Sequence, residues 1–219
     1  MTAGAAVDAA LAHLRAADPV LARLLDEHGP PDLRRDPSRP APGDHYAALV
    51  RSIVGQQLSV VAARSIYRRL LEHFGGHPPT PEQVLAADPD EMRLAAGLSR
   101  AKTTFLRSLA EHVISGDLEL ERLDDLPDDE VISELVAVKG IGEWSAHMFL
   151  MFQLERPDVL AVGDLGIRRA VERAYGLDAM PTPAELTALG EPWRPYRTVA
   201  CRVLWHWLGN APAVTPETT

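Results

Sequence analysis

The sequence has 219 residues, a formal net charge of −9 at pH 7 and a single cysteine, Cys201. A chain of this length can bury a substantial core, and one cysteine excludes an internal disulfide, a thiolate zinc site and an iron–sulfur cluster held by the chain itself. The negative charge argues against a phosphate-binding surface over the whole molecule. A local basic face is still compatible with it, because eight acidic residues lie between Asp117 and Glu130, a stretch that we expect to be a solvated linker.

The N-terminal third contains no pattern of a membrane span or a signal peptide. Its first residues lack the charged-then-apolar order of a signal peptide, and polar residues interrupt every long apolar run, so we expect a cytoplasmic protein without contact to membranes. The proline-rich residues 29–44 predict an irregular connection between helices. From Ser59, apolar residues recur at helical spacing until Gly75, and residues 99–114 behave similarly before Gly116.

Helix starts are marked at three further places. Each combines a capping side chain, a proline at the first helical position and an acid or amide at the third. Only residues 158–164, with the sequence DVLAVGD, look extended. The fold class is therefore predicted to be all-α. The three starts are Thr80-Pro81-Glu82-Gln83, Asp88-Pro89-Asp90-Glu91 and Thr182-Pro183-Ala184-Glu185.

The stretch VKGIGEWSA, residues 138–146, places Gly140 and Gly142 between two apolar helical segments. A dinucleotide-binding loop would need a preceding strand and a third glycine, and the sequence provides neither. The pattern instead predicts a helix, a tight hairpin in which both glycines permit positive φ and close backbone approach, and a second helix that begins near Trp144, with Ile141 filling the gap between the helices. The N–H groups at that second start are suited to bind an anion such as a DNA phosphate. A plain turn between two helices is the alternative.

Twenty-two residues after Gly142, Asp164 lies in the sequence LAVGDLGIRRA. The hairpin and this aspartate, together with GQQLS at residues 55–59, resemble the helix-hairpin-helix-Gly/Pro-Asp superfamily of DNA glycosylases, and most closely the AlkA-type DNA-3-methyladenine glycosylases. The resemblance covers residues 45–210. It is supported by the further stretches YAALVRSIVGQQLSVVAA, GLSRAKTTFLRSLA and PWRPYRTVACRVLWHW.

The resemblance implies two helical lobes with a DNA-binding cleft between them. One lobe would contain residues 45–155 with the hairpin, and the other would combine residues 1–44 with residues 156–219. Asp164 would be the catalytic carboxylate, because cleavage of an N-glycosidic bond builds positive charge on the sugar, which a fixed carboxylate stabilises. The alternative for Asp164 is a helix cap or a surface acid.

Three aromatic residues would line the pocket for the damaged base. Aromatic faces attract a purine that is alkylated on a ring nitrogen and therefore carries positive charge. On sequence alone, an aromatic residue at helical spacing is more often part of the core. Trp144 stands where bifunctional members carry a lysine nucleophile, so the resemblance implies a monofunctional enzyme that uses water. The expected pocket residues are Trp144, Trp205 and Tyr46.

The remaining DNA contacts follow from the same resemblance. Gln57 or Leu58 would fill the space of the flipped base, and the choice between them stays open. Carbonyl groups of Val136, Val138 and Ile141 could hold a monovalent cation, while no other cofactor and no structural metal are expected. The hairpin residues expected to contact DNA are Lys139, Gly140, Ile141, Gly142 and Ser145.

The sequence thus predicts a monomeric enzyme that excises alkylated purines of the 3-methyladenine and 7-methylguanine type from duplex DNA. The rival hypothesis is a noncatalytic helix-hairpin-helix protein that binds DNA or senses damage. Retention of Asp164 favours the enzyme.

Overall fold

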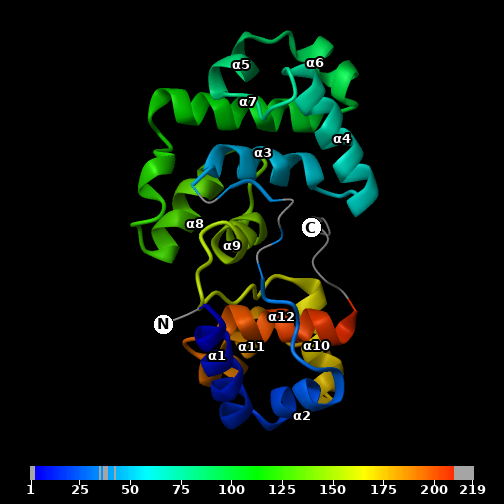
Figure 1. The fold of residues 1–219 in the computed structure, drawn as a ribbon, viewed down its shortest axis with the longest axis vertical. Helices are drawn as coiled ribbons and strands as arrows, with labels where there is room; N and C mark the ends of the chain where they lie inside the picture. Colours follow the sequence, from blue (N-terminus) through cyan, green and yellow to red (C-terminus); the bar gives the residue numbers. More distant parts are fainter. Residues whose placement is uncertain (1–2, 35, 37–38, 42, 210–219) are drawn as a thin grey trace. The chain divides into compact units, whose positions relative to one another are not determined.

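The computed structural model describes residues 3–34, 36, 39–41 and 43–209, and all regular secondary structure within these ranges is helical (Figure 1). The predicted all-α fold class is confirmed. None of the helices in these ranges is long and apolar enough to span a membrane. The chain divides into two compact units, which we call unit 1 (described residues up to 36 and from 155 on) and unit 2 (described residues from 39 to 154).

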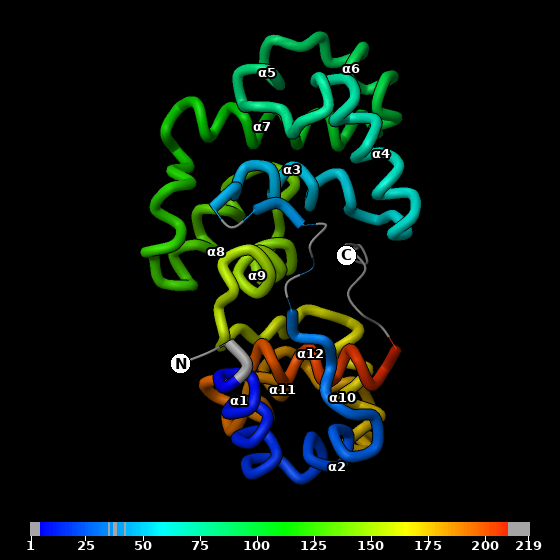
Figure 2. Tube along the Cα trace, in the orientation of Figure 1, coloured from blue at the N-terminus to red at the C-terminus, as the bar shows by residue number. Residues whose placement is uncertain are grey.

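Unit 2 is organised around α7 (Arg100–Ser115), which packs against α3 on one side and against α5 and α6 on the other (Figure 1). α3 also contacts α4 and α9, and α8 packs on α9. The chain path through the unit can be followed in Figure 2 from α3 in light blue through cyan and green to α9 in yellow-green. Its other elements are α3 (His45–Gly55), α4 (Val60–His73), α5 (Pro81–Ala86), α6 (Pro89–Ala96), the 3-10 helix η1 (Leu120–Arg122), α8 (Asp128–Ala137) and α9 (Glu143–Phe152).

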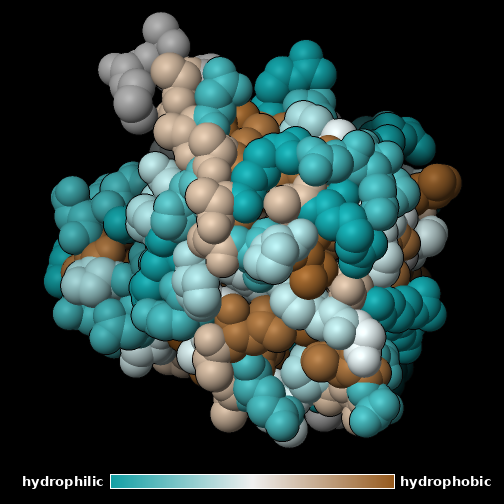
Figure 3. Space-filling view, turned by 90° about the horizontal axis from the view of Figure 1, so that it is seen from below, coloured by the Kyte–Doolittle hydropathy of each residue, from teal (hydrophilic) through white to brown (hydrophobic). Residues whose placement is uncertain are grey.

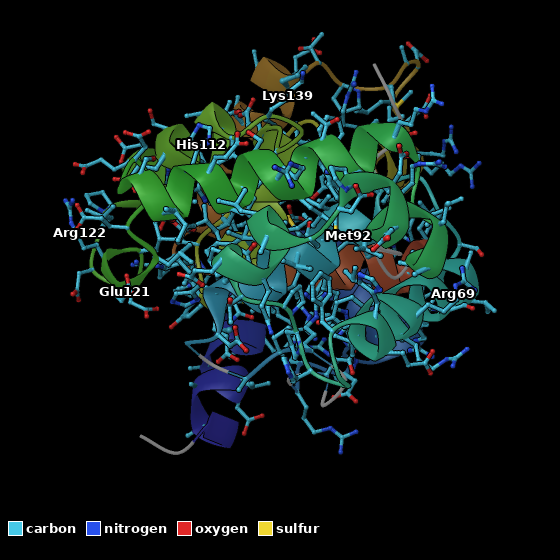
Figure 4. The ribbon with its side chains drawn as sticks, turned by 90° about the horizontal axis from the view of Figure 1, so that it is seen from above. Arg69, Met92, His112, Glu121, Arg122 and Lys139 are labelled. Atoms are coloured by element: carbon cyan, nitrogen blue, oxygen red, sulfur yellow. The ribbon has the colours of Figure 1, made fainter. Side chains whose placement is uncertain are left out.

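The helix boundaries of unit 2 agree with the expected caps. Thr80 and Gln83 form a complete capping box at the start of α5, and Asp88 accepts hydrogen bonds from two backbone N–H groups of α6. α6 ends at Gly97, which has φ +76° and allows the chain to turn towards α7. The guanidinium of Arg69 on α4 donates to the carbonyl of Ala96, so α4 closes the end of α6 (Figure 4).

The acidic stretch 117–130 is not the solvated linker that we expected. Leu118, Leu120 and Leu123 are buried, with at most 8% of their surface exposed, and a 3-10 helix forms at Leu120–Arg122. The last acidic residues belong to the first turn of α8, where carboxylates interact favourably with the helix dipole. The alternation of leucines with acids therefore anchors this segment to the core and turns most of its charge outwards.

Unit 1 is built on α12, which packs against α10, α2 and α1. The 3-10 helix η2 contacts α1 and α11. The segment 158–164, which looked extended in the sequence, forms turns in which the Asp164 N–H donates to the Ala161 carbonyl. The expectation of an extended segment is therefore wrong. The elements of unit 1 are α1 (Ala3–Ala17), α2 (Pro19–His28), α10 (Leu165–Tyr175), α11 (Pro183–Leu189), η2 (Glu191–Trp193) and α12 (Arg197–Leu208).

A buried aspartate joins three parts of unit 1. One carboxylate oxygen of Asp18, which is 7% exposed, accepts hydrogen bonds from Val20 N and Leu21 N and caps α2. The other accepts from the Tyr175 hydroxyl of α10 and from Trp193 Nε1 of η2, the latter at 2.8 Å. Trp193 is fully buried, so Asp18 satisfies an indole N–H that has no access to water.

The apolar surface is dispersed on the face of the molecule that Figure 3 shows. Hydrophobic residues form several separate groups there, with hydrophilic residues between them. Small scattered groups of this kind are normal on a protein surface and do not define a binding site.

We expect Asp18→Ala to lower the free energy of unfolding by about 2–4 kcal/mol, because it removes a helix cap and leaves the buried N–H of Trp193 without its acceptor. Asp88→Ala is the matched control: Asp88 caps α6 at an exposed position, so its loss should cost only about 1 kcal/mol. Urea unfolding of both variants measures the difference, and equal losses would contradict a special role of the Asp18 cluster.

Candidate DNA-binding and active-site residues

The predicted hairpin is present between α8 and α9. α8 ends at Ala137, the Ile141 N–H donates to the Val138 carbonyl at 3.0 Å, and α9 starts at Glu143. Ile141 is 5% exposed, as expected for a side chain that fills the gap between the two helices. The helix-hairpin-helix interpretation is confirmed.

The two glycines of the hairpin have different roles, which the sequence did not reveal. Gly140 has φ +90°, but Gly142 has φ −100° and is the N-cap of α9 in an extended conformation. Of the two glycines, which both permit positive φ, only Gly140 adopts it. A Cβ built on Gly142 meets no atom within 4 Å, whereas one built on Gly140 would lie 2.2 Å from Cγ of Phe105.

The hairpin rests on α7 of the same unit. Phe105 lies directly beneath Gly140, and the Lys139 N–H donates to Ser108 Oγ at 3.3 Å. Lys139 itself is exposed (labelled in Figure 4) and is therefore available to a phosphate, whereas Ser145 is only 6% exposed. A direct contact of the Ser145 side chain with DNA stays a prediction.

The turn that follows α3 carries the two candidates for the intercalating residue. Gln57 is exposed and has φ +56°, a left-handed conformation that non-glycine residues rarely adopt. Leu58 is half-buried, and Ser59 caps α4 through its hydroxyl. The geometry thus presents Gln57 rather than Leu58 to the outside. We call residues 56–59 the Gln57 turn.

Two residues that the sequence did not single out hold this turn. The side-chain amide of Gln56 donates to the carbonyl of Gly140 at 2.7 Å, which joins the Gln57 turn to the hairpin. The ammonium of Lys102 on α7 donates to the carbonyls of Val54 and Gln56, at 2.8 and 2.7 Å. The sequence places Lys102 within the helix expected at residues 99–114. Only the packing of α7 on α3 shows which carbonyls it binds.

In unit 1, Asp164 occupies a buried position at the start of α10. It is 8% exposed, and its Oδ1 accepts hydrogen bonds from Ile167 N at 2.8 Å and from Trp205 Nε1 at 3.0 Å. The helix cap that the sequence offered as an alternative is thus real. It does not exclude a catalytic role, because the cap uses Oδ1 as its acceptor and fixes the orientation of the carboxylate.

Trp205 packs against this carboxylate instead of standing at the surface. Its side chain lies on α12 and is 2% exposed. A Cβ on Gly166 would lie 3.0 Å from Asp164 Oδ1 and 3.4 Å from the Trp205 indole, so a side chain at this position would press tightly against the pair. Cys201, one turn earlier on α12, is fully buried, and burial, with a smaller effect of Asp164, raises the pKa of its thiol to about 12. The expected packing role of Cys201 is confirmed.

The segment before Asp164 is tied to α12 by a half-buried ion pair and hydrogen bonds. Arg197 Nε donates to Asp158 Oδ1 at 2.7 Å, and its Nη2 also donates to the Asp158 carbonyl. The Val159 N–H donates to the hydroxyl of Thr198 at 3.1 Å. These contacts fix the loop whose end carries Asp164.

The two other expected pocket residues belong to unit 2. Trp144 is half-buried in the first turn of α9. Tyr46 is 9% exposed, its hydroxyl has no hydrogen-bond partner among the described residues, and burial and then Glu82 on α5 raise its pKa. A place of either residue in a base pocket stays a prediction.

The carbonyl oxygens expected to hold a monovalent cation are compatible with one. Val138 O accepts one hydrogen bond, from Ile141 N, and a carbonyl oxygen has a second lone pair. The cation itself stays a prediction. Over the described ranges, no group of three or more histidine, cysteine or carboxylate side chains could hold a metal ion.

Comparisons with known proteins agree with this arrangement. The pattern of the HhH-GPD superfamily base excision DNA repair proteins matches residues 50–195, which include both the hairpin and Asp164. DNA-3-methyladenine glycosylase 1 of Schizosaccharomyces pombe is 37% identical over 162 residues, which cover 73% of this chain and 71% of that protein. DNA-3-methyladenine glycosylase 2 of Escherichia coli is 28% identical over 178 residues, or 77% of this chain and 60% of that protein.

A solved structure of the S. pombe 3-methyladenine DNA glycosylase in complex with abasic DNA superimposes with a TM-score of 0.77. It shares 34% sequence identity and covers 90% of this chain and 94% of its own. The present chain therefore belongs to the HhH-GPD superfamily of base excision DNA repair proteins, and within it to the AlkA-type DNA glycosylases.

We expect Gly140→Ala to weaken binding to any duplex DNA by tenfold or more, on the order of the effect of a 1.4 kcal/mol loss, because its Cβ collides with Phe105 and its φ is unfavourable for alanine. Gly142→Ala is the control on the other side of Ile141 and should bind nearly as the wild type does, since its Cβ enters open space. Fluorescence anisotropy with undamaged duplex measures both; equal losses would refute the difference.

Proposed function

We propose that this chain is a monofunctional DNA glycosylase that excises alkylated purines, of the 3-methyladenine and 7-methylguanine type, from duplex DNA. The observation that carries the proposal is the buried carboxylate of Asp164, which two N–H donors fix at the start of α10. The names of the similar proteins support the reaction. A monomeric state, a cytoplasmic location and a DNA-binding cleft between the lobes remain predictions.

The chemistry requires a negative charge beside the sugar of the damaged nucleotide. An alkylated purine is a good leaving group because its ring is already cationic, and its departure leaves oxocarbenium character on the deoxyribose. A preoriented carboxylate stabilises that charge without reorganising and can also orient or deprotonate the attacking water. We assign this role to Asp164.

The residue at the start of α9 explains why the DNA strand should stay intact after the base is removed. Trp144 stands in the first turn of α9, where a bifunctional enzyme would carry a lysine. An indole cannot form a Schiff base with the sugar. Water therefore completes the displacement, and the product is an abasic site.

DNA binding is assigned to unit 2. The N-terminus of α9 begins at a glycine cap without a side-chain acceptor, so its first N–H groups are directed to an anion, and Lys139 adds a positive charge beside them. These groups read phosphate and not sequence. Gln57 is our choice for the residue that fills the space of the flipped base, since its turn presents it outwards.

We expect Asp164→Asn to reduce base release by about 100-fold or more, because the amide can still accept both hydrogen bonds through its oxygen but carries no charge. Binding to DNA that contains an abasic site should change little. Single-turnover release of 7-methylguanine from methylated duplex measures the first quantity, and anisotropy measures the second. Asp178→Asn, at an exposed position of the same unit, is the control.

Two outcomes would contradict the assignment. Full activity of Asp164→Asn would show that Asp164 is only a helix cap. A wild-type protein that binds methylated duplex but releases no base would favour the noncatalytic damage sensor.

We expect Trp205→Phe to slow base release by about tenfold or more while leaving the fold intact, because phenylalanine keeps an aromatic ring but removes the N–H that donates to Asp164. Trp207→Phe, at a half-buried position two residues on, should have no comparable effect. If Trp205→Phe releases the base as fast as Trp207→Phe does, the indole N–H of Trp205 does not position the carboxylate.

A further inference from the structure

Lys102 is a buried cation with two main-chain partners. It lies on α7, is 9% exposed, and its ammonium donates to Val54 O and Gln56 O at the end of α3. Burial lowers the pKa of the amine, which reflects the cost of removing a charge from water. A surface lysine would avoid this cost, so the two hydrogen bonds offset it and also satisfy carbonyl groups that the end of a helix leaves unpaired.

One of the two carbonyls that Lys102 binds belongs to Gln56, the residue directly before Gln57. Gln56 is held at both ends: its carbonyl accepts from Lys102, and its side-chain amide donates to Gly140 O of the hairpin. Immediately afterwards, Gln57 adopts φ +56°. A left-handed glutamine persists only where its surroundings determine the backbone, and the two bonds of Gln56 provide that constraint.

One face of α7 therefore holds both the hairpin and the Gln57 turn, the two parts of unit 2 that we assign to DNA binding. Lys102, Phe105 and Ser108 are spaced by three residues, which places them on the same side of a helix. Lys102 binds the end of α3, Phe105 lies under Gly140, and Ser108 accepts from Lys139 N. The distance between the phosphate-binding hairpin and the Gln57 turn is thus set by a rigid helix.

We propose that Lys102 is a positioning residue for base extrusion: it holds the Gln57 turn at a fixed place relative to the hairpin, so that binding of phosphate by the hairpin drives Gln57 into the base stack. This inference rests on the proposed function of the chain as a base-flipping glycosylase. Lys102 does not touch the reacting atoms. Its effect is confined to the unstacking step, before the chemistry at Asp164.

The test uses Lys102→Met, which keeps a long apolar side chain but removes all three donors. Arg100→Met is the matched control, because Arg100 is an exposed cation two residues earlier on α7. Each variant is assayed by single-turnover release of one alkylated purine placed either in a complementary pair or opposite a mismatched base. A mismatched lesion is easier to unstack, so it depends less on the Gln57 turn.

For Lys102→Met we expect the rate of base release from the complementary pair to fall by about tenfold or more. The rate for the mismatched lesion should fall clearly less, because this lesion costs less free energy to unstack and unpair. Arg100→Met should leave the ratio of the two rates at the wild-type value. If Lys102→Met changes both rates by the same factor, or neither, the positioning role is refuted.

Two further measurements keep the proposal testable. Should Lys102→Met fail to show a cooperative unfolding transition, Gln56→Met removes only the bond to Gly140, and the same loss of the complementary-pair rate relative to the mismatch rate is expected. If the wild type releases no base, the proposed function fails, and fluorescence of 2-aminopurine beside an abasic site then reports unstacking alone. A signal that is equal in the wild type and Lys102→Met would overturn the inference.

Discussion

A buried carboxylate has to be hydrogen-bonded, and the way in which Asp164 meets this requirement organises unit 1 around the candidate active site. Its Oδ1 accepts hydrogen bonds from the first turn of α10 and from the indole of α12, so one carboxylate, which we propose as the catalytic group, connects both helices. Gly166 leaves the space for this approach. The structural role of Asp164 is therefore compatible with the catalytic role that we propose for it, and a helix cap is no evidence against catalysis.

The second constraint is the close approach of the hairpin to α7 in unit 2. Gly140 has no Cβ, which lets Phe105 pack against its backbone, and its positive φ turns the chain towards α9. Gly142 differs: it is the N-cap of α9, its φ is −100°, and a Cβ built there meets no atom within 4 Å. Of the two glycines, only Gly140 is thus required by close packing and by a positive φ.

The three aromatic residues that the family resemblance placed in a base pocket differ in how exposed they are. Trp205 is nearly inaccessible and its indole N–H donates to Asp164, so the positioning role that we propose for it does not require its face to meet a base. Tyr46 is 9% exposed, and burial raises the pKa of its phenol, so this ring is largely covered within unit 2. Trp144, at the start of α9, is half-buried and is therefore the most accessible of the three aromatic residues expected in the pocket.

The sequence by itself determined the helical class, the capped starts of α5, α6 and α11, the hairpin and the identity of the candidate carboxylate. The helical class, the capped starts and the hairpin depend on local rules: the spacing of apolar residues, the chemistry of caps and the conformational freedom of glycine. The candidate carboxylate followed from the resemblance of its motif to a known family. The tertiary structure decided which carbonyls Lys102 binds, that Gln57 rather than Leu58 faces outwards, that Trp205 donates to Asp164 and that residues 117–130 contribute leucines to the core. Each of these contacts joins residues that are distant in the chain or depends on which face is covered, and local sequence patterns do not encode partners that only the packing of helices brings together.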